Sequence, residues 1–158
     1  MSDKRDILFE RGATLSLLTF DQFTVPLLYE VLALRAEVFV VEQNCPYQDL
    51  DGMDQPSHHL MMRLGGELVG YLRLIPPGTR FATPTLGRFI IREPYRRDGL
   101  GRALLRRAIA HCEGLWGKGP ISLSGQAYLK EFYESEGFVA VDGPYLEDGI
   151  PHYEMIRS

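Results

Sequence analysis

The stretch LGRFIIREPYRRDGLGR, residues 86–102, decides the fold, because it changes from a strand pattern to a helix pattern across one short turn. Its first part is rich in apolar residues and predicts a buried strand over Leu86–Arg92. After the turn, apolar residues recur at every fourth position, at Leu100, Leu104, Ala108, Cys112 and Trp116. That spacing predicts a helix over about Gly99–Trp116, with one face packed against a core.

The turn between this strand and this helix is predicted to hold a polyphosphate. The start of a helix exposes backbone N–H groups that have no partner within the helix, and the helix dipole also favours an anion there. Gly99 and Gly101 would let a phosphate approach the main chain closely. Seven of the 17 basic residues lie between Arg88 and Arg107, although the net charge of the chain is −4. The alternative to a phosphate site is a basic turn that only caps a surface helix.

The remaining pattern predicts an α/β (α+β) fold. We expect strands at about residues 13–20, 58–64, 67–75, 121–124, 138–141 and 152–156, and helices at about 26–41 and 128–136. Residues 144–149 are predicted to form a turn, and Leu68, Leu72 and Leu74 to share one face of their strand. This order of elements predicts a mixed, mostly antiparallel sheet of about 6–7 strands with helices on both faces. Residues 13–158 would form one domain, preceded by a loose leader over residues 1–12.

The composition argues against several classes of protein. Apolar runs fall far short of the ~20 residues of a membrane span, and residues 1–11 lack the apolar core of a secretory signal. The net charge of −4 argues against nucleic acid as a partner. No His or Cys pair has zinc-binding spacing, so no metal site is expected. The two cysteines, Cys45 and Cys112, predict reduced thiols in a cytoplasmic protein.

Two sequence motifs carry a family resemblance. Arg96-x-x-Gly99-x-Gly101 resembles the [QR]-x-x-G-x-[GA] signature of the GNAT N-acetyltransferases, which cradles the pyrophosphate of acetyl-CoA. The segment Gln126-x-x-Leu129-x-x-Phe132-Tyr133-x-x-x-Gly137-Phe138 is similar to the later pattern N-x-x-A-x-x-[LF]-Y-x-x-x-G-F of the same family. Gln126 replaces the usual Asn and Leu129 the frequent Ala. Arg97 replaces a common Gly and must fit a tight turn without the conformational freedom of glycine.

A narrower resemblance covers most of the chain. Residues 35–47 (RAEVFVVEQNCPY), 49–54 (DLDGMD) and 145–155 (YLEDGIPHYEM) look like the ElaA-like branch of the GNAT superfamily. The resemblance implies the GNAT fold and acetyl transfer from the co-substrate acetyl-CoA to an amine of a small molecule or a peptide. A homodimer is a common outcome for this fold.

The resemblance also implies the site residues. A backbone N–H near Ile90 or Ile91 would meet the oxyanion of the reaction, and Tyr133 would protonate the CoA thiolate. The implied acetyl-CoA contacts are Phe89, Ile90, Ile91, Arg96, Arg97, Asp98, Gly99, Leu100, Gly101, Arg102, Gln126 and Phe132. An unperturbed alkylammonium is neutral in only about one molecule in 2,500 at pH 7, so a proton acceptor is needed as well. Glu42, after the first helix, and His152, at the start of the last strand, are the two candidates for this base.

Three questions stay open at the level of the sequence. The carboxylates of the polar loop 42–54 are either solvated loop charges or the lining of a pocket for a cationic group. The domain is either an enzyme or a non-catalytic acyl-CoA-binding or regulatory module, because a fold alone does not establish chemistry. A third function, acyl-homoserine-lactone synthesis, is weighed because Arg35-x-x-Val38-Phe39 faintly resembles part of such enzymes.

Overall fold

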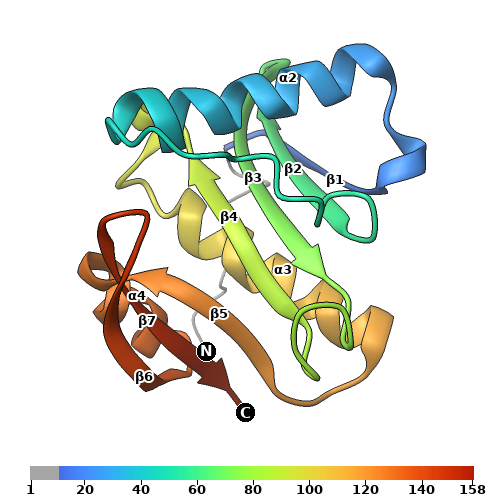
Figure 1. The fold of residues 1–158 in the computed structure, drawn as a ribbon. Helices are drawn as coiled ribbons and strands as arrows, with labels where there is room; N and C mark the ends of the chain where they lie inside the picture. The colour runs from blue at the N-terminus through green and yellow to red at the C-terminus, as the bar shows by residue number, and fades with distance from the viewer. Residues whose placement is uncertain (1–10) are drawn as a thin grey trace.

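A computed structural model describes residues 11–158 as one seven-stranded sheet with helices on both faces (Figure 1). The strands are β1 (Ala13–Thr19), β2 (His58–Leu64), β3 (Glu67–Ile75), β4 (Thr85–Ile91), β5 (Ile121–Gln126), β6 (Phe138–Glu147) and β7 (Ile150–Arg157). Their order in the sheet is β1-β2-β3-β4-β5-β7-β6, and β4 with β5 is the parallel pair among the strands of residues 11–158. The predicted mixed, mostly antiparallel sheet is therefore confirmed. Most of the predicted leader, residues 1–10, lies outside the described residues.

The helices bury two separate apolar clusters against the sheet. Helix α2 (Val25–Ala36) starts after Thr24, whose hydroxyl accepts the N–H of Leu27, and it continues as a π-helix, η2 (Glu37–Glu42). It packs on β2, β3 and β4. Helices α3 (Leu100–Trp116) and α4 (Lys130–Ser135) contribute to the larger cluster on the opposite face. Short 3-10 turns occupy η1 (Phe20–Gln22), η3 (Glu93–Tyr95) and η4 (Ala127–Leu129).

Strands β4 and β5 separate after a very short contact. Two residue pairs join them, Thr85 with Ser122 and Leu86 with Leu123. Beyond that point β4 carries a bulge, because Gly87 pairs with Arg73 whereas Ile90 pairs with Tyr71. The extra residue is accommodated at Arg88, whose φ of 53° lies in the left-handed region. The bulge and the divergence open the sheet in its middle (Figure 1).

One face of the β5–β7–β6 part of the sheet is polar. Side chains alternate along a strand, so the buried Leu123 and Met155 leave Ser124 and Glu154 on the opposite face. The register places Ser124 beside Glu154, and Gln126 beside His152. Helix α2 lies over β2–β4, and among the described elements no helix covers this polar face. Polar groups on the face therefore border the opening between β4 and β5.

Three local predictions were wrong. Strand β6 continues to Glu147, where a turn over residues 144–149 was predicted, because its second half pairs with β7. Strand β5 likewise extends to Gln126. Leu68 lies on the α2 side, away from Leu72 and Leu74, because a bulge in β3 inserts Val69 between the pairs Met62 with Gly70 and Arg63 with Leu68.

Among residues 11–158, no helix combines the length and the apolar character that crossing a membrane requires. Within the same residues, no group of three or more His, Cys, Asp and Glu side chains is placed to hold a metal ion. Cys45 and Cys112 are buried free thiols. Burial raises the pKa of the Cys112 thiol to about 12, which leaves it unreactive at neutral pH.

Candidate active site

A groove of about 810 Å³ lies where β4 and β5 diverge. Its lining includes eleven of the predicted site residues: Glu42, Phe89, Ile90, Ile91, Arg96, Arg97, Gly101, Gln126, Phe132, Tyr133 and His152. Four predicted contacts are outside this lining, namely Asp98, Gly99, Leu100 and Arg102. The fold therefore brings both predicted bases, the predicted acid and most of the predicted acetyl-CoA contacts to one place.

The start of α3 offers unpaired backbone donors at one end of the groove. The first hydrogen bond of the helix runs from the N–H of Ala103 to the carbonyl of Gly99, so the three preceding N–H groups have no partner within the helix. Gly99 has φ 83° and Arg97 has φ 70°, so Arg97 adopts the glycine-like conformation expected of it. The Arg97 side chain is exposed and makes no ion pair with any described residue. An anion at this helix end would meet both the amides and this cation.

Two other arginines of the turn already have partners. The guanidinium of Arg96 donates to the carbonyl of Ile91 at 2.6 Å and pairs with Glu42 at 2.7 Å. It thereby joins the end of β4 to η2 across the groove. Arg102 pairs with Glu136, and its guanidinium lies 5.1 Å from the ring centre of Phe132. Within residues 11–158, Arg97 is therefore the arginine of this turn whose charge is not already paired with a carboxylate.

Tyr133 reaches the groove from a packed aromatic cluster. Its ring centre lies 5.4 Å from that of Phe132 and 6.0 Å from that of Phe138, and the residue is 6% exposed. Burial raises the pKa of its phenol, so the hydroxyl keeps its proton. Gly125 makes room for the ring, because a Cβ at this position would lie 2.7 Å from Cε2 of Tyr133. The ring of Tyr133 is thus fixed by packing, and its protonated hydroxyl lies at the wall of the groove.

His152 belongs to a polar chain on the open face of the sheet. Its Nδ1 lies 2.6 Å from the carbonyl oxygen of Ile150, which can only accept, so Nδ1 carries a hydrogen. Nε2 then faces the carboxylate of Glu147 at 3.3 Å. Ser124 donates to the same carboxylate at 3.3 Å, and its hydroxyl lies 2.6 Å from that of Tyr145. Glu147 and Ile150 therefore hold the His152 ring in a fixed orientation on the open face of the sheet.

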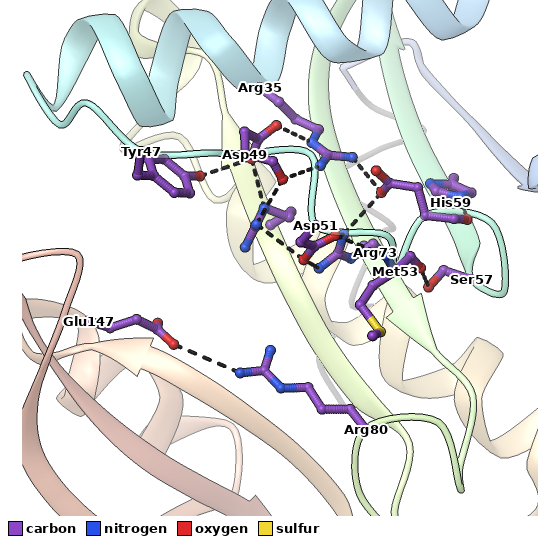
Figure 2. Close-up of polar contacts among 12 residues, drawn as sticks. Arg35, Tyr47, Asp49, Asp51, Met53, Ser57, His59, Arg73, Arg80 and Glu147 are labelled. Atoms are coloured by element: carbon purple, nitrogen blue, oxygen red, sulfur yellow. Dashed lines mark hydrogen bonds and ion pairs between the residues drawn. The ribbon is translucent and has the colours of Figure 1, made fainter.

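The carboxylates of the loop after η2 form a closed ring of ion pairs with three arginines (Figure 2). Each aspartate bridges two arginines and each arginine two aspartates, in the cyclic order Asp49, Arg35, Asp54, Arg73, Asp51, Arg88. The contacts run from 2.6 to 3.3 Å. We call these six residues the ion-pair ring. These carboxylates are therefore not simply solvated loop charges: they bind arginines of the protein itself, and Asp51 also lines the groove, as does Glu42 at the start of the loop.

Arginine contacts lower the pKa values of two aspartates in the ring. Burial opposes the ionisation of Asp54, but hydrogen bonds and charges from Arg35 and Arg73 outweigh it and hold the pKa of this carboxyl below its usual value. Asp51 is affected in the same way, with burial outweighed mainly by Arg73. The ring fixes the loop to β3 and β4, and Tyr47, Gln48 and Asp51 from this loop line the groove.

Several residues in or beside the groove were missed by sequence reasoning. Glu147, Ser124 and Tyr145 support His152, and Gly125 accommodates Tyr133. The alternation of apolar and hydroxyl residues from Ile121 onward was a signal for Ser124, since hydroxyls on one side of a short strand indicate a polar face. Glu147 had no such signal, because it was placed in a turn.

Comparison with known proteins places the chain among acetyltransferases. The family model described as acetyltransferase (GNAT) domain matches residues 28–158. Protein ElaA of Escherichia coli strain K12 is 40% identical to this chain over 139 residues, which cover 87% of this chain and 91% of that protein.

Solved structures agree with the sequence matches. The crystal structure of Escherichia coli ElaA superposes with a TM-score of 0.87 at 38% identity, over 92% of this chain and 99% of that chain. An acyl-CoA N-acyltransferase from Pseudomonas aeruginosa gives 0.88 at 43% identity over the same shares. An aminoglycoside 6'-N-acetyltransferase complexed with coenzyme A shares the fold, with a TM-score of 0.69 at 17% identity over 90% of this chain and 96% of that chain.

Proposed function

We propose, on the premise that this chain belongs to the ElaA-like branch of the GNAT acetyltransferase family, that it transfers the acetyl group of acetyl-CoA to an amine. The observation that carries the proposal is the groove between β4 and β5, which joins the open start of α3 to Tyr133 and His152. The acceptor would bind at the His152 end and the two substrates would react directly with each other.

The residues at the α3 end fit coenzyme A. Unpaired amides and Arg97 suit a pyrophosphate. The edge of β4 that faces the divergence suits the pantetheine amides. Acetyl-CoA supplies the activated acetyl thioester, and the chain supplies binding, orientation and proton transfer.

His152 is the better placed base. Its Nδ1 is fixed by the carbonyl of Ile150, and its Nε2 lies on the groove side, 3.3 Å from the carboxylate of Glu147. The carboxylate of Glu42 already binds the guanidinium of Arg96 at 2.7 Å, so it is engaged with a side chain of the protein and not directed at the acceptor. We therefore assign His152 to take the proton of the acceptor amine and Glu42 to position Arg96.

The base assignment predicts a specific change in pH dependence. His152→Gln keeps a polar side chain of similar length but cannot take up a proton, so kcat/KM should fall about 10²-fold at pH 7. The acidic limb of the pH profile of kcat/KM should disappear, while calorimetry should give an unchanged Kd for acetyl-CoA. Glu42→Gln is the matched control and should keep the limb. A limb that survives in His152→Gln and vanishes in Glu42→Gln would reverse the two roles.

Binding of acetyl-CoA at the α3 end is tested by a pair of glycine variants. Gly99→Val should raise the Kd for acetyl-CoA at least tenfold by calorimetry, because valine cannot keep φ near 83° and the helix start would turn its amides away. Gly117→Val is the matched control, since Gly117 has φ 86° at the other end of the same helix. It should lower thermal stability similarly and leave the Kd unchanged. Equal affinities for both variants would show that the ligand binds elsewhere.

A further inference from the structure

The groove carries more acidic than basic charge at its His152 end. The side chains of Glu147, Asp148 and Glu154 line this end together with one arginine, Arg80. Arg80 lies 3.9 Å from Glu147 and its side chain is 41% exposed, so the pair is weak. We call this part of the groove the acceptor arm.

The arginines of the ion-pair ring do not offset this negative charge. The ring contains three arginines and three aspartates, so its charges balance. The side chains of Arg35 and Arg73 are each 1% exposed, which leaves no guanidinium surface for a carboxylate of the acceptor. Arg88 is bound to Asp49 and Asp51. Figure 2 shows the ring separated from the Arg80–Glu147 pair.

Neither Asp148 nor Glu154 of the acceptor arm makes an ion pair with any of residues 11–158, and of the two Glu154 is the half-buried one on the strand that carries His152, whereas Asp148 is exposed. Glu147 supports His152, and Glu154 lies beside Ser124. His152 and Glu154 lie two residues apart on the same face of β7, which separates them by about 7 Å along the strand. A second charged group of the acceptor would reach Glu154 while its first group lies at His152.

We propose that the acceptor is a primary amine that carries a second ammonium group, and that Glu154 holds this second group. The proposal rests on the proposed function and narrows its acceptor to dicationic amines. Roughly four or five methylene groups would bridge the distance between His152 and Glu154. The same chemistry occurs in a free diamine and in a basic residue of a peptide.

The reaction balances without a further reactant. The neutral amine forms the N–C bond to the acetyl carbon as the C–S bond of the thioester breaks. The surplus proton of the nitrogen passes to His152, and CoA leaves as a thiolate that accepts a hydrogen bond from the Tyr133 hydroxyl and takes its proton from water. The acetylated product has lost one positive charge, so it interacts more weakly with the acceptor arm and is released more readily.

A matched series of small amines tests the proposal. 1,4-Diaminobutane, 1-butylamine and 4-aminobutanoate have the same reacting amine and a remote ammonium, methyl or carboxylate group. CoA release should give a kcat/KM at least tenfold higher for the diamine than for butylamine, with the aminobutanoate lowest. The preference should shrink as salt is added, because salt screens exposed charges.

Three variants test whether Glu154 causes the preference for the diamine over butylamine. Glu154→Gln should bring the ratio of diamine to butylamine kcat/KM close to one. Arg80→Gln removes the cation of the arm and should raise the ratio. Glu131→Gln is the control, because it removes the same charge from an exposed carboxylate of α4 outside the groove, and it should leave the ratio unchanged.

A binding measurement separates this proposal from the proposed function. Calorimetry of the enzyme loaded with CoA should give tighter binding of 1,4-diaminobutane than of the other two amines, with the difference lost in Glu154→Gln. Binding of this kind without turnover would support the acceptor class and overturn the acetyl transfer. Equal rates and equal affinities for the three amines would overturn the acceptor class and leave acetyl transfer standing. Reaction of a lysine peptide amide that carries a second ammonium group, but of none of the small amines, would support the acceptor class and assign its source to a peptide.

Discussion

Tyr133→Phe should lower kcat for CoA release by about 10²–10⁴-fold and leave the Kd for acetyl-CoA unchanged. The phenylalanine ring keeps the packing against Phe132 and Phe138 and the fit against Gly125, so the variant removes only the hydroxyl. An unperturbed phenol at pKa ~10 gives its proton to a thiolate at ~8.5 with a cost of about 2 kcal/mol. Burial raises the pKa of this phenol and increases the cost, so Tyr133 acts mainly as a hydrogen-bond donor to the leaving sulfur.

The measurement is CoA release at saturating amine, with Kd from calorimetry. Tyr29→Phe is the control, because Tyr29 is 78% exposed on α2, away from the groove. An unchanged kcat in Tyr133→Phe would remove Tyr133 from the chemistry. Binding of acetyl-CoA without turnover on any amine would instead indicate a non-catalytic acyl-CoA-binding module on the same fold.

Asp54→Asn should lower the free energy of unfolding at pH 7 by about 3–5 kcal/mol, the usual cost of removing one partner of a buried ion pair. Asp54 is 6% exposed and bridges Arg35 and Arg73, so the variant leaves two buried guanidinium groups short of a counter-charge. Urea denaturation at pH 7 measures the loss. Asp21→Asn, at an exposed position in η1, should change the stability by less than about 0.5 kcal/mol.

The difference between wild type and Asp54→Asn should depend on pH. The pKa of Asp54 in the folded protein is below its usual value, so its stabilisation is present above the unfolded-state pKa of ~3.9 and is lost as the pH falls through the folded-state pKa. The free energies of unfolding of the two proteins should therefore differ by a constant amount between pH 5 and 8. This difference should shrink as the pH falls below about 4. A difference that stayed constant down to pH 3 would mean that Asp54 does not stabilise the fold through its charge.

Loss of the ion-pair ring would also change the shape of the groove. Asp51 and Arg73 belong to the ring and line the groove as well, and the loop that they anchor supplies Tyr47 and Gln48 to the same wall. The ring therefore links the stability of the domain to the shape of its groove.

Much of the fold follows from short-range signals in the sequence. Strands β2 and β3 have the predicted bounds, because alternating apolar residues flank Gly65-Gly66, and both glycines adopt the positive φ that a two-residue hairpin requires. The start of α3 is where the apolar period and Gly99 place it. Arg97 takes the left-handed conformation that the surrounding turn imposes. Each of these features depends on residues within about one turn or one hairpin of each other.

The sequence by itself therefore determined the β2–β3 hairpin and the start of α3, since local spacing and turn chemistry specify them, and its motifs indicated the family of the fold. Only the tertiary structure decided that Asp49 would meet Arg88, 39 residues away, and that Glu147 would lie behind His152. These contacts depend on a bulge in β4 and on the register of β6 with β7. Such long-range pairing is set by the packing of the whole sheet, because a carboxylate in a loop has no local preference for one arginine over another.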